Sequence, residues 1–199
     1  MFECAHQPYP LPAALAEELA AAYSEPHRAY HNTTHIAELL RWFDRVADDI
    51  GWQAPGDIYT AILFHDAIYV PGAKDNEAQS AVWARRAIAQ YALPANADRV
   101  AELIELTAQH GKLAGADGDT ALFLDTDMAI VGSEIDAYRE YAQQIRREYS
   151  AIPADMYRAG RRAFVQSLAT KPAIFFTDYF SGRLNLRARL NLADELASL

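Results

Sequence analysis

A His-Asp pair lies inside an apolar run in the stretch Ile62-Leu63-Phe64-His65-Asp66-Ala67-Ile68-Tyr69, residues 62–69 of the chain. Apolar residues recur around it at the spacing of one buried helical face, at Ile58, Ala61, Ile62, Ile68 and Tyr69. His65 falls on that face. A buried imidazole beside a buried carboxylate is costly unless a charged or hydrogen-bonding group satisfies both. A divalent metal ion would do so, and the stretch therefore predicts a helix that carries metal ligands.

The same helical periodicity continues in both directions along the chain, and Pro and Gly residues separate the periodic runs. No run shows the sustained alternation of a strand. Three expected helices are identified by single residues: one contains Leu15, Leu19 and Ala22, one carries His65-Asp66 and ends before Pro71, and one is opened by Pro153. The others are expected over residues 35–50, 76–93, 97–110, 119–132, 133–149 and 183–198. Asp119 and Ser133 are the expected N-cap residues of the helices 119–132 and 133–149. The sequence predicts an all-α fold, a bundle of about eight to nine helices in one domain over residues 1–199.

Composition and charge exclude several classes of protein. The chain has 199 residues, of which 51% are apolar and 23% charged, as in ordinary globular proteins. Its net charge of −9 argues against binding to a nucleic-acid polymer or an anionic membrane. We expect no membrane span or secretory signal, because no long apolar run and no charged-then-apolar leader occur. The single Cys4 excludes a disulfide framework and a cysteine-rich zinc site, and favours the cytoplasm.

Two more segments place a polar side chain on an apolar helical face. His35 lies one turn before Leu39, and Asp127 has apolar residues at its helical neighbour positions. A lone histidine on such a face is more often a satisfied core residue than a ligand. Because the coincidence occurs on three separate helices, we expect a shared ion held by His35, His65, Asp66 and Asp127. His and carboxylate ligands suit Mn, Fe, Co, Ni or Zn, and also Mg where carboxylates and water dominate.

The order His…His-Asp…Asp resembles the HD superfamily of metal-dependent phosphohydrolases, in which these four side chains bind the catalytic metal. The chain is also similar, over nearly its whole length, to a small bacterial branch of predicted HD phosphohydrolases. That likeness is carried by Tyr30-His31-Asn32…His35, by His65-Asp66-Ala67-Ile68-Tyr69…Asp75-Asn76-Glu77, by Phe123-Leu124-Asp125-Thr126-Asp127, and by Lys171-Pro172…Thr177-Asp178-Tyr179-Phe180…Ala188-Arg189-Leu190-Asn191-Leu192. The resemblance implies an HD-type helical domain that hydrolyses a phosphate ester or anhydride, and it defines no substrate.

Two aspartates compete for the last ligand position. Asp125 and Asp127 project about 200° apart around a helix, so both cannot face one ion. The family pattern places the ligand at the second acid of an Asp-x-Asp, which is Asp127 here. We expect Asp125 to cap a helix, to form a pair or to support the site from behind.

Other residues near the motifs have a functional and a structural interpretation each. His31 is expected to bind substrate phosphate or to cap a helix, and Asn32 to cap that helix or to reach the site. In the loop after the His-Asp pair, Lys74 and Asn76 are candidate substrate contacts and Glu77 is a candidate proton acceptor. Asp75-Asn76 also has the pattern of an ordinary helix N-terminus.

His110 at the end of residues 97–110 would allow a second metal ion, as in some HD enzymes, although a histidine at a helix C-terminus is also favoured by the helix dipole. The leading hypothesis is a metal-dependent phosphohydrolase acting on a nucleotide or another small phosphometabolite, with Asp66 and Glu77 as catalytic residues. The alternatives are a di-iron HD-type oxygenase and a non-catalytic domain that senses a nucleotide or metal. A homo-oligomer is left open.

Overall fold

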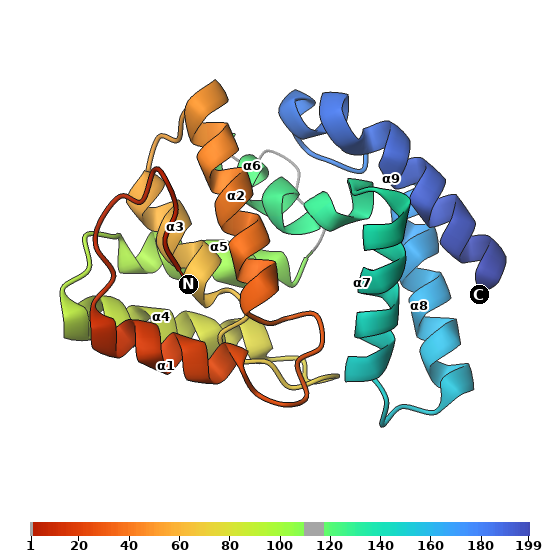
Figure 1. Ribbon diagram of the computed structural model, residues 1–199, viewed down its shortest axis with the longest axis horizontal. Helices are drawn as coiled ribbons and strands as arrows, with labels where there is room; N and C mark the ends of the chain where they lie inside the picture. Colours follow the sequence, from red (N-terminus) through yellow and green to blue (C-terminus); the bar gives the residue numbers. More distant parts are fainter. Residues whose placement is uncertain (1, 110–117) are drawn as a thin grey trace. The chain divides into compact units, whose positions relative to one another are not determined.

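The computed structural model describes residues 2–109 and 118–199 (Figure 1). Within these ranges it contains nine α-helices and one 3-10 helix, η1, and no strand, which confirms the predicted all-α class. The elements are α1 (Ala13–Tyr23), α2 (Thr33–Asp49), α3 (Pro55–Phe64), α4 (Asn76–Tyr91), α5 (Ala97–Thr107), α6 (Gly118–Met128), η1 (Ala129–Gly132), α7 (Ile135–Glu148), α8 (Ala154–Ala169) and α9 (Asp178–Ser198). None of the helices in the described ranges has the length and apolar character needed to cross a bilayer.

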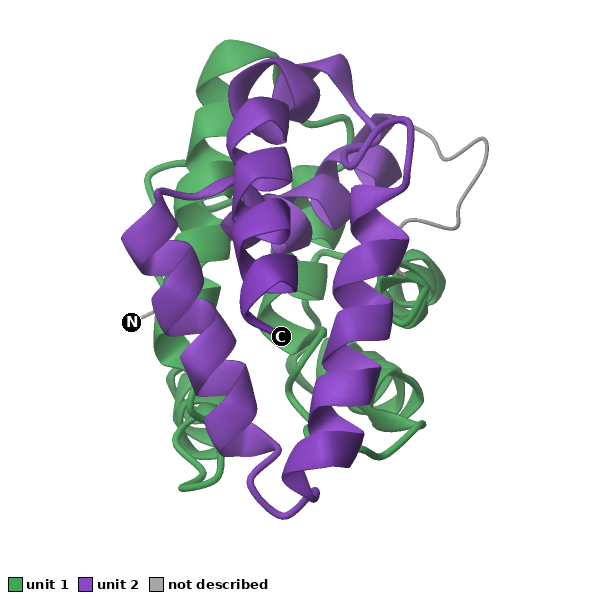
Figure 2. Cartoon of the chain, turned by 90° about the vertical axis from the view of Figure 1, so that its right-hand side faces the viewer, with its two compact units in different colours: residues 1–110 green, residues 111–199 purple. Residues whose placement is uncertain are grey.

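The contacts divide the chain into two compact units, residues 1–110 and residues 111–199, which Figure 2 colours separately. The first unit contains α1 to α5, and the second contains α6 to α9 together with η1. The expectation of a single domain over residues 1–199 stays a prediction.

In the first unit, α3 is the central helix and packs against α2, α4 and α5 (Figure 1). Its seven residues from Ile58 to Phe64 are all buried. The expected single apolar face is therefore wrong for this helix, which is covered on every side. By contrast, α2 buries one face, with His35, Leu39, Phe43 and Val46 inside, as its periodicity predicts.

The third helix ends earlier than the sequence predicts. α3 stops at Phe64, His65 is its C-cap residue, and Asp66 lies in the turn that follows. The apolar pattern continues to Tyr69 because the turn itself is buried at Ala67 and Tyr69. The helical position of His65-Asp66 is thus corrected to a helix terminus, while the expected burial of His65 is confirmed at 1% exposed.

In the second unit, α9 packs against α8, α7 and η1. It begins at Asp178, five residues before the expected start at 183, because the side chain of Thr177 accepts a hydrogen bond from the backbone N–H of Phe180 and caps it. The sixth expected helix is divided into α6 and η1 at Met128–Ala129, and Asp119 lies in the first turn of α6 instead of at its cap. The residue before α7 is Glu134, and the expected cap Ser133 precedes it.

Candidate metal centre

The end of α3 and the first turn of α2 bring two histidines and an aspartate together in the first unit. The Nε2 atoms of His35 and His65 are 3.2 Å apart. The carboxylate oxygen Oδ2 of Asp66 lies 2.9 Å from Nε2 of His65 and 3.6 Å from Nε2 of His35. Both imidazoles are buried and Asp66 is mostly buried. We call His35, His65 and Asp66 the His-His-Asp cluster.

The spacing within the His-His-Asp cluster fits a transition-metal ion. Two ligands bound at about 2.1 Å on one ion are about 3.0 Å apart at an octahedral angle and about 3.4 Å apart at a tetrahedral angle. The separation of 3.2 Å between the two Nε2 atoms falls between these values. The Asp66 oxygen is at comparable distances, and the donor set of two imidazoles and a carboxylate is one that such ions prefer.

The ring of His65 is oriented by the backbone of its own helix. Its Nδ1 lies 3.0 Å from the carbonyl oxygen of Ile62. Because a carbonyl only accepts hydrogen bonds, Nδ1 carries a proton, and Nε2 is the ring nitrogen that faces His35 and Asp66. A metal-binding histidine usually donates its second N–H in this way.

Asp66 is held in its charged form. Burial by itself would raise the pKa of the Asp66 carboxyl, but the neighbouring His65, His31 and His35 outweigh burial and hold the pKa well below its usual range. The carboxylate is therefore available as an anionic ligand at neutral pH.

All four carbonyl groups at the end of α3 have hydrogen-bond donors, although helix ends commonly leave these groups to water. The carbonyl of Ala61 accepts from His65 N, that of Ile62 from His65 Nδ1, that of Leu63 from Tyr23 Oη, and that of Phe64 from Ala67 N, at 2.9–3.0 Å. Side chains thus complete the helix end at the position where the His-His-Asp cluster begins.

Three side chains from elsewhere in the unit hold the turn at residues 66–70. Arg28 donates to the carbonyls of Asp66 and Ala67 at 2.7 and 3.0 Å. The hydroxyl of Ser80 accepts from the N–H of Ile68 and donates to its carbonyl. Asn76 bonds both the N–H and the carbonyl of Val70, each at 3.0 Å. The roles of Arg28 and Ser80 could not be predicted, because no local sequence pattern relates these residues to the turn.

His31 lies near the cluster, with its ring centroid 5.8 Å from that of His35 and 4.3 Å from that of Tyr69. Asn32 is the N-cap residue of α2, as one of its two interpretations predicts. Its Oδ1 accepts from the N–H of Thr34 at 2.8 Å, and its Nδ2 donates to the carbonyl of Ala29.

The loop residues have different surroundings. Asn76 is buried, and both ends of its amide are occupied by Val70, so in this structure it fastens the loop. Lys74 is exposed in the loop, and Glu77 is partly buried in the first turn of α4. Their roles toward a substrate stay predictions.

Asp127 and Asp125 belong to the second unit and lie in α6. Asp125 is buried and accepts hydrogen bonds from the N–H groups of Phe176 and Thr177 and from the Thr177 hydroxyl, at 2.6–2.8 Å. Asp125 thus holds the backbone that leads into α9, whose own N-cap residue is Thr177. Asp127 is partly buried in the last turn of α6, and its place among the ligands stays a prediction. His110, the candidate for a second ion, lies outside the described residues.

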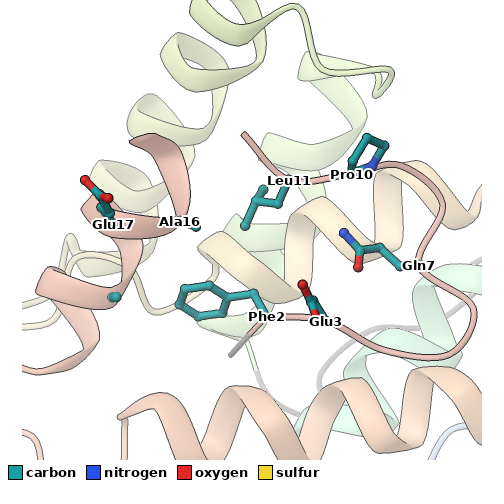
Figure 3. Close-up of a pocket in the computed structure, with 8 residues that line it drawn as sticks. Phe2, Glu3, Gln7, Pro10, Leu11, Ala16 and Glu17 are labelled. Carbon is teal, nitrogen blue, oxygen red and sulfur yellow. The ribbon is translucent and has the colours of Figure 1, made fainter. Parts of the chain in front are cut away.

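A separate hollow of about 360 Å³ lies between the N-terminal segment and α1 (Figure 3). Its lining is Phe2, Glu3, Gln7, Pro10, Leu11, Ala16, Glu17 and Ala20. The lining includes none of the predicted site residues, and its surface is mostly apolar, so it offers no ligand set of the kind found in the His-His-Asp cluster.

Comparisons of this chain with protein-family models, curated proteins and solved structures found no match. The sequence motifs and the geometry of the His-His-Asp cluster are therefore the features that point to a function.

Proposed function

We propose that the protein is a metal-dependent phosphohydrolase acting on a nucleotide or another small phosphorylated metabolite. The observation that supports this most is the approach of two imidazole Nε2 atoms to 3.2 Å beside a carboxylate oxygen, in a buried position at a helix end. The order of the motifs, which resembles that of HD phosphohydrolases, adds the reaction class. A divalent ion held there would supply an activated water and neutralise charge on the phosphoryl group.

In the proposed site, each of the predicted residues has a defined role. His35, His65 and Asp66 hold the ion, and the order of the motifs predicts Asp127 as the further ligand. Asp66 stays anionic because its neighbours lower the pKa of its carboxyl. Glu77 or Asp66 accepts the proton of the attacking water. His31 and Lys74 contact the phosphate, Asn32 caps the helix that carries His35, and Asn76 holds the loop that carries Lys74.

The first test measures metal binding. Protein stripped of metal is titrated with Mn, Fe(II), Co, Ni, Zn and Mg separately, and binding is followed by calorimetry and elemental analysis. We expect stoichiometric binding of at least one transition metal and a large loss of affinity in H35Q and H65Q. The matched control is H6Q, because His6 is exposed and pairs with Asp48 on the surface of the same unit. Asp127 is tested by D127N against D136N, an aspartate of the same unit in the first turn of α7.

The second test measures the reaction. Phosphate release is followed over a panel of nucleotides and sugar phosphates with each metal, and oxygen consumption is recorded in parallel with the iron-loaded protein. Release that depends on metal and disappears in H65Q supports the proposal. A flat response across the panel with bound metal argues against a hydrolase, and oxygen uptake would favour the oxygenase alternative. Metal binding with neither activity would favour a sensor.

A further inference from the structure

Arg28 is a buried arginine beside the His-His-Asp cluster. Its side chain is 0% exposed, and its guanidinium carbon lies 5.2 Å from the ring centroid of Tyr23 and 5.5 Å from that of Tyr69. A buried guanidinium is costly unless its N–H groups have acceptors. Here the acceptors are one carboxylate, on Glu25, and three backbone carbonyls.

The three carbonyls belong to the two segments that carry the histidine ligands. Nη1 of Arg28 donates to the carbonyl of His31 at 3.1 Å and to that of Asp66 at 2.7 Å. Nη2 donates to the carbonyl of Ala67 at 3.0 Å. His31 is four residues before His35, and Asp66 follows His65 directly. One nitrogen atom thus connects the approach to α2 with the turn after α3.

The third nitrogen of the guanidinium, Nε, fixes the arginine itself. Nε donates to Oε2 of Glu25 at 2.9 Å, and Glu25 is half-exposed just after α1. The planar fork of a guanidinium directs several N–H groups in one plane, whereas a lysine ammonium offers three donors from a single point. Lysine would therefore keep the charge but could not reach His31, Asp66 and Ala67 in this arrangement.

We propose that Arg28 is a positioning residue for the metal centre: it sets the distance between His35 and the His65-Asp66 pair by clamping the backbones that carry them. This inference rests on the proposed function, because it assigns a role within the same site. Arg28 contacts no ligand side chain in the hydrogen bonds described, so its effect on the ion is indirect. Residues of this kind typically change metal affinity by about 10- to 100-fold when they are replaced.

The test compares R28K with R45K in the full chain, using Co²⁺ as the probe. Arg45 lies over the ring of Trp42 on the outside of α2 in the same unit, and R45K makes the same chemical change away from the cluster. We expect R28K to bind Co²⁺ about 10- to 100-fold more weakly than wild type and to change the visible absorption bands, which report coordination geometry. R45K should match wild type in both measurements. A purely structural role would lower the melting temperature of R28K without altering the bands of the bound ion.

The outcomes separate the two proposals. If wild type binds Co²⁺ and R28K has the affinity and spectrum of R45K, the role of Arg28 is overturned while the metal centre stands. If wild type binds no metal, both are overturned. If R28K does not fold, E25Q serves instead, because it removes only the half-exposed anchor of the guanidinium. E25Q should weaken Co²⁺ binding by about two- to fivefold, the range of a surface ion pair, and unchanged binding would overturn the proposal.

Discussion

The loop after the His-Asp pair has two interpretations, as a substrate-binding loop or as a loop that Asn76 fastens to the protein. The sequence makes Asn76 a candidate substrate contact, whereas in the structure its Oδ1 accepts from the N–H of Val70 and its Nδ2 donates to the carbonyl of Val70, each at 3.0 Å. Replacing Asn76 by Ala removes both bonds. A neutral hydrogen bond contributes about 0.5–1.5 kcal/mol net, so the two together contribute about 1–3 kcal/mol. Because Val70 is 55% exposed, water replaces part of the loss, and we expect about 1–2 kcal/mol.

Native-state hydrogen exchange measures this loss at the residue concerned. The N–H of Val70 is bonded to Asn76, whereas the N–H of Ile68 is bonded to Ser80 at 3.0 Å and serves as an internal control. Since about 1.4 kcal/mol corresponds to a tenfold change, N76A should accelerate exchange of the Val70 amide about 5- to 30-fold. The Ile68 amide should change much less in N76A, and S80A should show the reverse pattern.

A second variant separates the two bonds. N76D keeps an oxygen that can accept from the N–H of Val70 but loses the donor to its carbonyl, so protection of the Val70 amide should be largely retained. Unchanged exchange of Val70 in N76A would refute the loop-fastening role. If N76A instead raised KM for a phosphorylated substrate with normal exchange at Val70, the substrate-contact interpretation would be correct.

Three further predictions concern other parts of the chain. Burial raises the pKa of the Asp125 carboxyl to about 6, although its hydrogen bonds from Thr177 and Phe176 act in the opposite direction. A pKa raised by folding contributes stability below the unfolded value of 3.8, and this stability is lost as the pH rises through 6. The unfolding free energy of wild type relative to D125N should therefore fall between pH 4 and pH 7, and a rise would contradict this prediction. In the second unit, R161M should lower the free energy of unfolding by about 3–5 kcal/mol, because it leaves Glu195 buried without its bidentate partner. In denaturant unfolding, the apolar triple variant R161M/E195L/Y138F should recover most of that stability. Equal losses in the two variants would show that the burial of an unpaired charge is not the cause. Burial and the nearby Asp44 carboxylate raise the pKa of the Cys4 thiol to about 12. Alkylation of Cys4 by iodoacetamide at pH 8 should therefore be slow in the folded protein and fast in urea. Equal rates would exclude a protected thiol.

Periodicity and Pro or Gly punctuation were sufficient to predict the helical class and the position of most helices. α2 is the clearest case, because its buried face follows from the spacing of His35, Leu39, Phe43 and Val46. Local rules also predicted Asn32 as the cap of that helix. The angle between Asp125 and Asp127 indicated that both cannot face one ion, and Asp125 is occupied by three donors near α9, whereas the ligand role of Asp127 stays a prediction.

The end of α3 could not be predicted in the same way. An apolar sequence pattern indicates which residues are buried, and not where a helix ends. Here the buried residues continue from the helix into the turn, at Ala67 and Tyr69. What stops the helix at Phe64 is the set of donors around its last carbonyls, and Tyr23 comes from a helix 40 residues away in sequence. For the same reason Arg28 carried no signal. Its partners are backbone carbonyls, which every residue has, so no sequence pattern identifies them.

The hydrogen bonds that hold this turn determine how the proposed metal site would form. The carbonyls at the end of α3 and the polar backbone groups of Ile68 and Val70 have hydrogen-bond partners within the protein. The energy of placing His65 and Asp66 is therefore supplied by folding of the first unit, and an ion would not have to order the turn when it binds. If the protein binds an ion as proposed, removing that ion should then leave the Val70 and Ile68 amides protected. Loss of their protection on chelation would mean that the ion, and not Arg28, Ser80 and Asn76, holds the turn in place.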